Sequence, residues 1–504
     1  MRNLIVCCDG TWCDEDSTDD GIVSPSNVLK VFRGVDQSVQ NGAPQQLTRY
    51  QSGVGTEGIM KKLLGGIVGY GLNEDIEDCY YWLSDKFEIG DKIFLFGFSR
   101  GAFTARSLAG LITRYGLLKL PKDNALQSAR TVKELYRNGY RKGSEEVARG
   151  YSFHKNSDSI DFLGVWDTVG ALGIPDDKSI LDLFDNPLSY QFHDVQLSSK
   201  VKQARHALAL DEERGSFTPT MWVGTDDRDN DTVKQVWFPG AHSDIGGGYK
   251  EQGLSDCTLK WMVDEARSFP GSTLRFKEGF FQQVNPNAFD MVHDSHVGIM
   301  KALIPSPRSV PKLVESEKVS PCVMERIENP PIQQSDYRPL KPFIDNEIEI
   351  DIYAKHPWSW TGVYLEAGKE YRFQATGVWF DKNIPCPPSG ASDDEFHLGE
   401  VFHVLGTAFG KVESAWEKLI GNKNADFAGT RRYESSDWFC LMGSIANGSQ
   451  PSRDGTPDDH ETFEIGVNKT KEVDKSGYLY CFANDAWGLY GNNRGYITLT
   501  IKEM

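Results

Sequence analysis

Residues 92–103 read KIFLFGFSRGAF, and they combine an apolar run, a Gly-x-Ser-x-Gly motif and the start of a helical pattern. A serine hydroxyl is a poor nucleophile unless a base takes its proton and the chain holds its oxygen clear of the sheet. A sharp turn from strand to helix does this for Ser99, and Gly97 and Gly101 allow neighbouring backbone to approach closely. The motif occurs by chance in long chains, but this context predicts a nucleophilic Ser99, with the amide of Arg100 donating to an oxyanion.

The acid and the base of such a hydrolase are expected downstream of the serine, in that order and each just after a strand. Asp167 follows the apolar run 160–166, and Asp211 follows a second apolar run, so both are candidate acids. His242 follows a strand-like run and precedes a glycine-rich loop, which predicts that it is the base. The ordinary alternatives are a helix cap for Asp167 and a structural role for a lone histidine.

A second oxyanion donor is expected from residues 9–12, the loop after the first apolar run. Gly10 permits close backbone approach, and the amide of Thr11 is the candidate donor. We expect the carboxylate of Asp9 to point away, because a negative charge beside an oxyanion is unfavourable. His206 lies inside an apolar run, so we predict a buried structural histidine there.

The 504 residues divide into three regions that differ in composition and in the pattern of apolar residues. Up to about residue 265, strand-like runs alternate with helical patterns, which predicts an α/β fold with a mostly parallel sheet and helices on both faces. The strands are expected at 4–8, 92–96, 160–166 and 233–238, and the helices at 73–86 and 102–118.

The second region, residues 266–345, is rich in proline, serine and charge, and we expect an irregular or lid-like connection. The third region carries strand-like runs at 347–353, 371–380, 440–445, 477–482 and 496–501. Turn residues separate these runs, which predicts an all-β sandwich. We therefore expect a catalytic domain over 1–345 and a sandwich domain over 346–504.

The charge balance argues against some partners. The chain has 54 Lys+Arg and 72 Asp+Glu, a net charge of −18, whereas nucleic acid requires a cationic face. No apolar run reaches the roughly 18 residues of a membrane span, and the first run is too short for a signal peptide. The nine cysteines form no C-x-x-C pair, so we expect cytoplasmic synthesis and reduced thiols.

Six short motifs occur in order within the first 260 residues. They are residues 8–12, 26–28, 53–56, 97–102, 165–170 and 238–248. Through them the chain resembles the uncharacterised alpha/beta hydrolase domain family that includes the phospholipase effectors of type VI secretion. The resemblance implies a Ser99–Asp167–His242 triad that needs no cofactor, with Asp167 favoured over Asp211. It also implies ester hydrolysis of phospholipase A type, signal-independent export, and delivery or immunity proteins as partners.

The C-terminal sequence resembles a second family. Residues 479–496 read LYCFANDAWGLYGNNRGY, which is similar to the calcium site of galactophilic PA-I type bacterial lectins. The resemblance implies a galactose-like glycan as ligand and a Ca²⁺ ion held by Asp485, Asn492, Asn493 and the carbonyls of Leu489 and Asp381. Ca²⁺ prefers about six to eight hard oxygen ligands, which such residues supply. The alternative is an asparagine-rich hairpin turn.

The sequence thus predicts a serine esterase or lipase of phospholipase type with a calcium-dependent, lectin-like C-terminal domain. Two alternatives stay open. One is a carbohydrate esterase in which the sandwich presents an acetylated glycan. The other is a calcium-dependent glycan-binding protein on a hydrolase scaffold without activity.

Overall fold

The computed structural model describes residues 1–10, 13, 16–39, 42–53, 70–169, 196–225, 231–297, 304–314, 316–391, 431–447, 451–452 and 455–504. Its contacts divide the chain into two compact units. The first unit is Met1–Met300, Glu317–Pro331 and Pro451–Thr456, and the second is Lys301–Ser316, Ile332–Gln450 and Pro457–Met504. Some segments before residue 345 therefore belong to the second unit, so the chain alternates between the units instead of crossing once.

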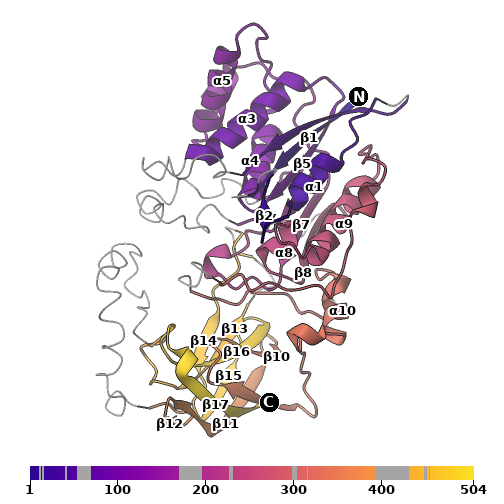
Figure 1. Ribbon diagram of the computed structural model, residues 1–504. Helices are drawn as coiled ribbons and strands as arrows, with labels where there is room; N and C mark the ends of the chain where they lie inside the picture. The colour runs from indigo at the N-terminus through magenta and orange to yellow at the C-terminus, as the bar shows by residue number, and fades with distance from the viewer. Residues whose placement is uncertain are drawn as a thin grey trace. The chain divides into compact units, whose positions relative to one another are not determined.

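The first unit is built on a six-stranded sheet in the order β4-β1-β5-β6-β7-β8 (Figure 1). The strands are β1 (Arg2–Cys8), β4 (Gln45–Gln51), β5 (Lys92–Phe98), β6 (Phe162–Trp166), β7 (Ala204–Ala209) and β8 (Val233–Phe238). Every neighbouring pair is parallel. The carboxyl ends of all these strands therefore lie at one edge of the sheet, as in the predicted α/β fold.

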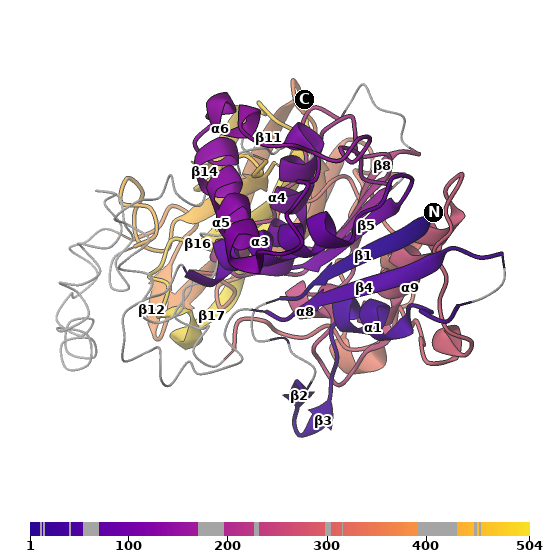
Figure 2. The ribbon, with the colours of Figure 1, turned by 90° about the horizontal axis from the view of Figure 1, so that it is seen from above.

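Helices cover both faces of this sheet (Figure 2). The helices of this unit are α1 (Asn27–Gly34), α3 (Tyr70–Lys86), α4 (Arg100–Tyr115), α5 (Ala125–Glu134), α6 (Glu145–Arg149), α8 (His242–Gly246), α9 (Gly253–Ser268) and α10 (Pro321–Glu328). A π-helical segment, Leu135–Tyr140, follows α5, and the short strands Thr18–Asp19 (β2) and Ile22–Val23 (β3) pair with each other.

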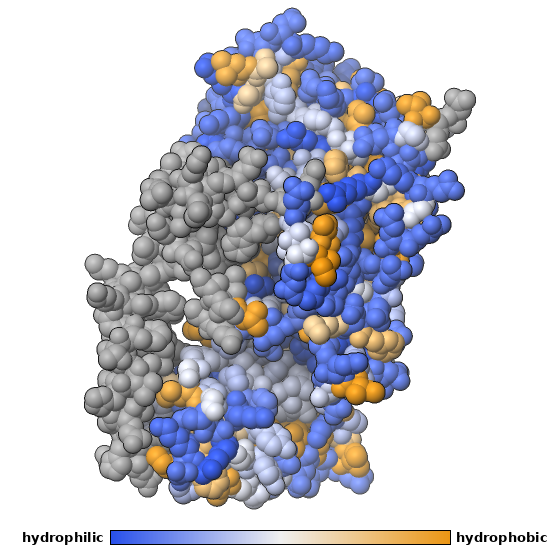
Figure 3. Space-filling view, viewed as in Figure 1, coloured by the Kyte–Doolittle hydropathy of each residue, from blue (hydrophilic) through white to orange (hydrophobic). Residues whose placement is uncertain are grey.

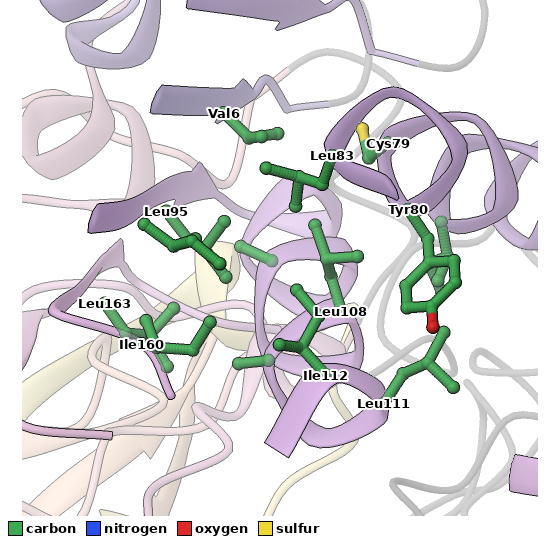
Figure 4. Close-up of a cluster of buried hydrophobic side chains, with 14 of the residues drawn as sticks. Val6, Cys79, Tyr80, Leu83, Leu95, Leu108, Leu111, Ile112, Ile160 and Leu163 are labelled. Carbon is green, nitrogen blue, oxygen red and sulfur yellow. The ribbon is translucent and has the colours of Figure 1, made fainter. Parts of the chain in front are cut away.

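Alternate residues of a strand point to opposite faces, so each strand contributes to two cores. Val6 and Leu95 pack with α3 and α4 on one face (Figure 4). Cys7 and Phe96 pack with α1 and α9 on the other face. Burial on both faces explains why the sequence shows continuous apolar runs at β1 and β5 and not an alternating pattern.

The sequence-based prediction missed one strand of the sheet, β4, and recognised another, β7, only as the apolar run before Asp211. β4 reads QQLTRYQ and lies at an edge, where most of its side chains are only partly buried. β7 contains the buried Arg205 and His206, which are polar residues in a central strand. Arg205 is paired with Glu265 at 2.6 Å, and His206 accepts a hydrogen bond from the Thr168 amide at 3.1 Å. Tertiary partners thus permit polar residues that obscure the strand pattern, and His206 is the buried structural histidine we predicted.

The second unit contains two antiparallel sheets, one in the order β10-β16-β13-β14 and one in the order β12-β11-β17-β9, with β15 paired to β11. The strands are β9 (Glu347–Tyr353), β10 (Ser359–Leu365), β11 (Glu370–Asp381), β12 (Ile384–Cys386), β13 (Leu441–Ala446), β14 (Glu461–Glu464), β15 (Asn468–Glu472), β16 (Gly477–Ala483) and β17 (Asn493–Glu503). Both sheets contribute to one core, for example Trp379 and Leu499 from one and Leu441 and Leu479 from the other. The predicted all-β sandwich is confirmed.

Apolar side chains are gathered mainly inside these cores. On the face drawn in Figure 3, hydrophilic residues predominate among the described ones, and the apolar residues appear in small separate groups. In the described parts of the chain, no helix is both long enough and apolar enough to cross a bilayer. Between α9 and β9, the described residues contain α10 and two single 3₁₀ turns, Phe280–Gln282 and Ile332–Gln334.

Candidate active site

Ser99 lies at the sharp turn between β5 and α4. Its φ of 56° and ψ of −123° are rare for a residue with a Cβ, and it is buried. Its N–H donates to the carbonyl of Trp166 in β6 at 3.1 Å. Such a strained backbone persists only where its surroundings fix it, and it is common at functional sites. Arg100 begins α4, and the first N–H groups of a helix have no acceptor within that helix.

The glycines of the Gly-x-Ser-x-Gly motif allow α4 to pack directly on the sheet. A Cβ on Gly101 would overlap the carbonyl oxygens of Cys8 and Asp9 at the end of β1. A Cβ on Gly97 would lie 2.5 Å from the carbonyl oxygen of Gly101. Any side chain at either position would therefore push the helix away from the strand and displace Ser99 between them.

Gly10 brings the loop after β1 beside the nucleophile. A Cβ on Gly10 would lie 2.9 Å from the Phe98 ring and 3.3 Å from Cβ of Ser99. The backbone of Gly10 is thus close enough to Ser99 to contribute to its surroundings. Thr11, the predicted second oxyanion donor, lies outside the described residues.

The carboxylate of Asp9 holds the start of the same loop. One oxygen accepts a hydrogen bond from the Gly10 amide at 2.7 Å. The other accepts from the hydroxyls of Ser26 at 2.5 Å and Tyr50 at 2.8 Å. The role of Asp9, which the sequence left open, therefore includes tying this loop to the N-terminus of α1 and to β4.

Asp167 and His242 are joined by a buried hydrogen bond. His242 Nδ1 lies 2.7 Å from Asp167 Oδ2, and the other carboxylate oxygen accepts from the Ala209 amide at 2.9 Å. Asp167 follows β6 directly with a positive φ of 36°, a conformation uncommon outside glycine. The carboxylate of Asp211, the other candidate acid, accepts instead from the Gly240 amide at 2.7 Å.

The imidazole of His242 lies beside the serine turn. Its ring centroid is 4.7 Å from that of Phe98, the residue before Ser99, and 5.2 Å from that of Phe217. A Cβ on Gly246 would overlap the Phe98 ring, so the end of helix α8 packs tightly there. The ends of β5, β6 and β8 thus bring the predicted serine, acid and histidine to one edge of the sheet.

Two buried carboxylates hold the backbone of the turn that carries the histidine. Glu212 Oε2 accepts from the His242 amide at 3.2 Å, and Glu212 also pairs with Arg214 at 2.7 Å. Asp244 Oδ2 accepts from the Ala241 amide at 2.9 Å and closes the first turn of α8. Sequence reasoning missed Glu212 and interpreted Asp244 only as a turn residue. The sequence predicted a glycine-rich loop after His242, whereas residues up to Gly246 form α8, so the position of Asp244 in the first turn of a helix was not apparent.

A small hollow lies next to the serine turn, lined by Asp9, Gln51, Asp75 and Arg100 among others. Burial, followed by the charges of nearby acids, raises the pKa of Asp75 to about 7. Gln51 donates to its Oδ1 at 2.8 Å. This carboxyl therefore changes its protonation state near neutral pH.

The predicted calcium ligands lie together in the second unit. Asp485 is buried, and its Oδ2 accepts from Asn493 Nδ2 at 2.8 Å. Asn492 Nδ2 donates to Asp381 Oδ1 at 2.8 Å, and the backbone N–H of Asn492 donates to the Leu489 carbonyl at 3.3 Å. Burial raises the pKa of Asp485 to about 6. The turn between β16 and β17 therefore gathers two carboxylates and two side-chain amides.

The side-chain oxygens of Asn492 and Asn493 are buried and have no hydrogen-bond partner. Leaving such an atom unsatisfied costs about 1–3 kcal/mol, so a cation bound beside these oxygens would stabilise the turn. Within the described residues, no three His, Cys, Asp or Glu side chains cluster as metal ligands. A site here would rely on amide and carbonyl oxygens beside the two carboxylates, which suits Ca²⁺.

Comparison with known families gives one match that spans over half of the chain. The model of the type VI secretion phospholipase effector Tle1-like catalytic domain matches residues 2–265. A curated relative, the uncharacterised protein YEL023C of Saccharomyces cerevisiae, is 30% identical over 239 residues. That match covers 43% of this chain and 32% of the yeast protein, so the chain spans about a third of that relative's length.

Three solved structures show weaker similarity. An uncharacterised protein from Pseudomonas aeruginosa has a TM-score of 0.34 and 17% identity, covering 57% of this chain and 49% of its own. The Tle1 effector bound to the VgrG spike of the type 6 secretion system has a TM-score of 0.32 and 21% identity, covering 49% and 51%. The EclA N-terminal domain, a PllA-like lectin, has a TM-score of 0.19 and 16% identity, covering 32% and 100%.

Proposed function

The chain belongs to the family of Tle1-like phospholipase effectors of type VI secretion through residues 2–265, and from this we propose that it is a serine esterase acting on phospholipids. The family itself supports a lipase or phospholipase function. The finer proposal is carried by one observation: the 2.7 Å hydrogen bond between His242 and Asp167, next to a serine with a strained backbone.

In this mechanism Ser99 Oγ attacks the ester carbonyl, and His242 takes its proton and later gives it to the leaving alcohol. Asp167 accepts from Nδ1, which leaves Nε2 for the serine and stabilises the imidazolium. The Arg100 amide and the loop at Gly10, with the Thr11 amide, hold the oxyanion; losing one donor costs about 2.7–4 kcal/mol. Water then hydrolyses the acyl-enzyme with His242 as base.

Fatty acid release from phospholipid vesicles, measured by mass spectrometry, tests the proposal. We expect release by the wild type and by Ser107→Ala, a serine further along α4, but only background release by Ser99→Ala. Equal release by wild type and Ser99→Ala would contradict the proposal. Acetate release from acetylated glycans without fatty acid release would favour the carbohydrate esterase.

We propose a second function for the second unit, calcium-dependent binding of a galactose-like glycan. Asp485, Asn492, Asn493 and the Leu489 carbonyl would hold the ion, with Asp381 beside them. Ca²⁺ prefers about six to eight oxygen ligands, so it would supply open coordination positions that hydroxyls of a sugar could fill. The buried, partnerless oxygens of both asparagines support this. We expect a galactose resin to retain the protein only when calcium is present. Retention that a chelator does not change would contradict this proposal.

Family membership also supports export through a type VI secretion system, with a spike protein and an immunity protein as partners. Comparing culture supernatants of strains with and without the apparatus tests this part. Equal amounts of the protein in both supernatants would contradict it.

A further inference from the structure

Residues 287–297 have no regular secondary structure, and we call this segment the strap. The strap is hydrogen-bonded to two carboxylates that hold the turn carrying the imidazole. His293 Nδ1 lies 2.7 Å from Asp244 Oδ1, and the His293 amide donates to Asp244 Oδ2 at 3.0 Å. The hydroxyl of Ser295 donates to Glu212 Oε1 at 2.8 Å. Glu212 and Asp244 also accept the N–H groups of His242 and Ala241, so each of these two carboxylates links the turn to the strap.

The strap is anchored at its other end by two helices. The buried Arg326 of α10 donates through Nη1 to the carbonyls of Ala288 and Asp290, both at 2.7 Å. Asp290 Oδ2 in turn accepts from the Gly253 amide at the start of α9, also at 2.7 Å. The strap is therefore held in place independently of the turn, and it can fix the turn's position.

The imidazole of His293 lies between two acids. Asp244 is on Nδ1, Glu251 Oε2 lies 3.2 Å from Nε2, and the Tyr249 ring stacks on it at 3.8 Å. Only the imidazolium has two N–H donors, so it is the form that satisfies both carboxylates. Burial lowers the pKa of His293, but the hydrogen bonds and charges of Asp244 and Glu251 outweigh burial and raise this pKa overall.

We propose that His293 is a positioning residue that clamps Asp244 and thereby fixes the turn that presents His242 to Ser99. The inference rests on the proposed esterase function. Misplacing a catalytic group by about 1 Å can cost about 100-fold in rate, so a loosened turn would reduce kcat without changing substrate contacts. Protonated His293 can donate to both Asp244 and Glu251. As pH rises through the raised pKa, the imidazole loses its charge and one N–H donor, so its hold on Asp244 weakens.

Steady-state kinetics of the full chain on a p-nitrophenyl ester test this, with His293→Gln as variant and His154→Gln as control. His154 contacts Phe87 after α3, at the opposite edge of the sheet. We expect kcat of His293→Gln to fall about tenfold with KM nearly unchanged. The wild type and the control should lose kcat at alkaline pH, whereas His293→Gln should lack that decline. An unchanged kcat, or the same alkaline decline in the variant, would overturn the proposal.

Hydrogen–deuterium exchange of the peptide 238–247 provides a readout that does not depend on ester hydrolysis. We expect this peptide to exchange faster in His293→Gln than in wild type and in His154→Gln. Equal exchange would overturn the proposal that the strap fixes the turn. If His293→Gln does not fold, Ser295→Ala replaces it and should show the same direction. If Ser99→Ala retained activity, the proposed esterase would fail, but the exchange result would still decide whether the strap fixes the turn.

Discussion

The turn after β8 and the turn before β17 both enclose buried carboxylates, but they satisfy their polar atoms differently. In the first, Asp167, Glu212 and Asp244 each accept hydrogen bonds from backbone amides and from side chains. In the second, the side-chain oxygens of Asn492 and Asn493 are buried without partners. A fully bonded network holds its side chains in place, whereas buried oxygens without partners leave room for a ligand. The contrast fits the two functions that we propose, ester hydrolysis at the first site and ion binding at the second.

The largest effect is expected at Asp167, in the fully bonded network around His242. Asp167→Asn should reduce kcat for ester hydrolysis about 10⁴-fold, because an amide cannot stabilise the imidazolium and favours the wrong tautomer. Steady-state kinetics measure this. Asp211→Asn, which keeps an acceptor for Gly240, serves as control and should retain most of the activity. An equal loss in both variants would remove the distinction between the two acids.

The next largest effect is expected at the turn before β17, where the asparagine oxygens have no partners. Calcium at about 100 times its dissociation constant should stabilise the second unit by about 2.7 kcal/mol, because the ion binds only the folded form. Differential scanning calorimetry should therefore show a higher Tm with Ca²⁺ than with EGTA. Asp485→Ala should abolish the shift, whereas Glu347→Gln, an exposed acid of β9, should keep it. No shift in the wild type would refute a calcium site.

The calcium-induced rise in Tm should itself depend on pH. Since the pKa of Asp485 is raised to about 6, protons compete with the ion at acid pH. The calcium-induced rise in Tm should be full at about pH 7.5 and should shrink below about pH 6. Without calcium, the raised pKa means that the contribution of Asp485 to stability falls as pH rises toward that value. A calcium shift of equal size at both pH values would contradict this.

The smallest effect is expected at Asp75, the carboxyl in the hollow beside Ser99. Its pKa of about 7 exceeds its ordinary value of 3.8, so the folded state binds more protons and stability falls as pH rises across this interval. Asp75→Asn should therefore raise the free energy of unfolding at about pH 8 by about 1–2 kcal/mol, with less change at about pH 5. Urea denaturation measures both values. Equal effects at both pH values would show that ionisation of Asp75 is not the cause.

The sequence predicted those parts of the fold whose pattern is local. The runs at β1 and β5 are apolar on both faces of a central strand, so they were recognisable in isolation. The polar edge strand β4 was not recognisable, and of the central strand β7 only the apolar end was, because the polar residues of both strands depend on partners elsewhere in the chain.

The same limit applies to the candidate site. Ser99, Asp167 and His242 were found from their order in the chain and from their positions just after strand-like runs. The roles of Glu212 and His293 had no local signal. Glu212 meets Ser295 83 positions away, and His293 meets Asp244 across 49 positions, so only the folded chain reveals these contacts.

Covalent labelling with a fluorophosphonate tests most directly whether His242 and Asp167 activate Ser99, since the reagent modifies only an activated serine. Tryptic mass spectrometry should find one adduct, on Ser99, in the wild type. Labelling should be absent in Ser99→Ala and strongly slowed in His242→Asn and Asp167→Asn. An adduct on another serine, or labelling of Ser99 at the wild-type rate without His242, would contradict the mechanism.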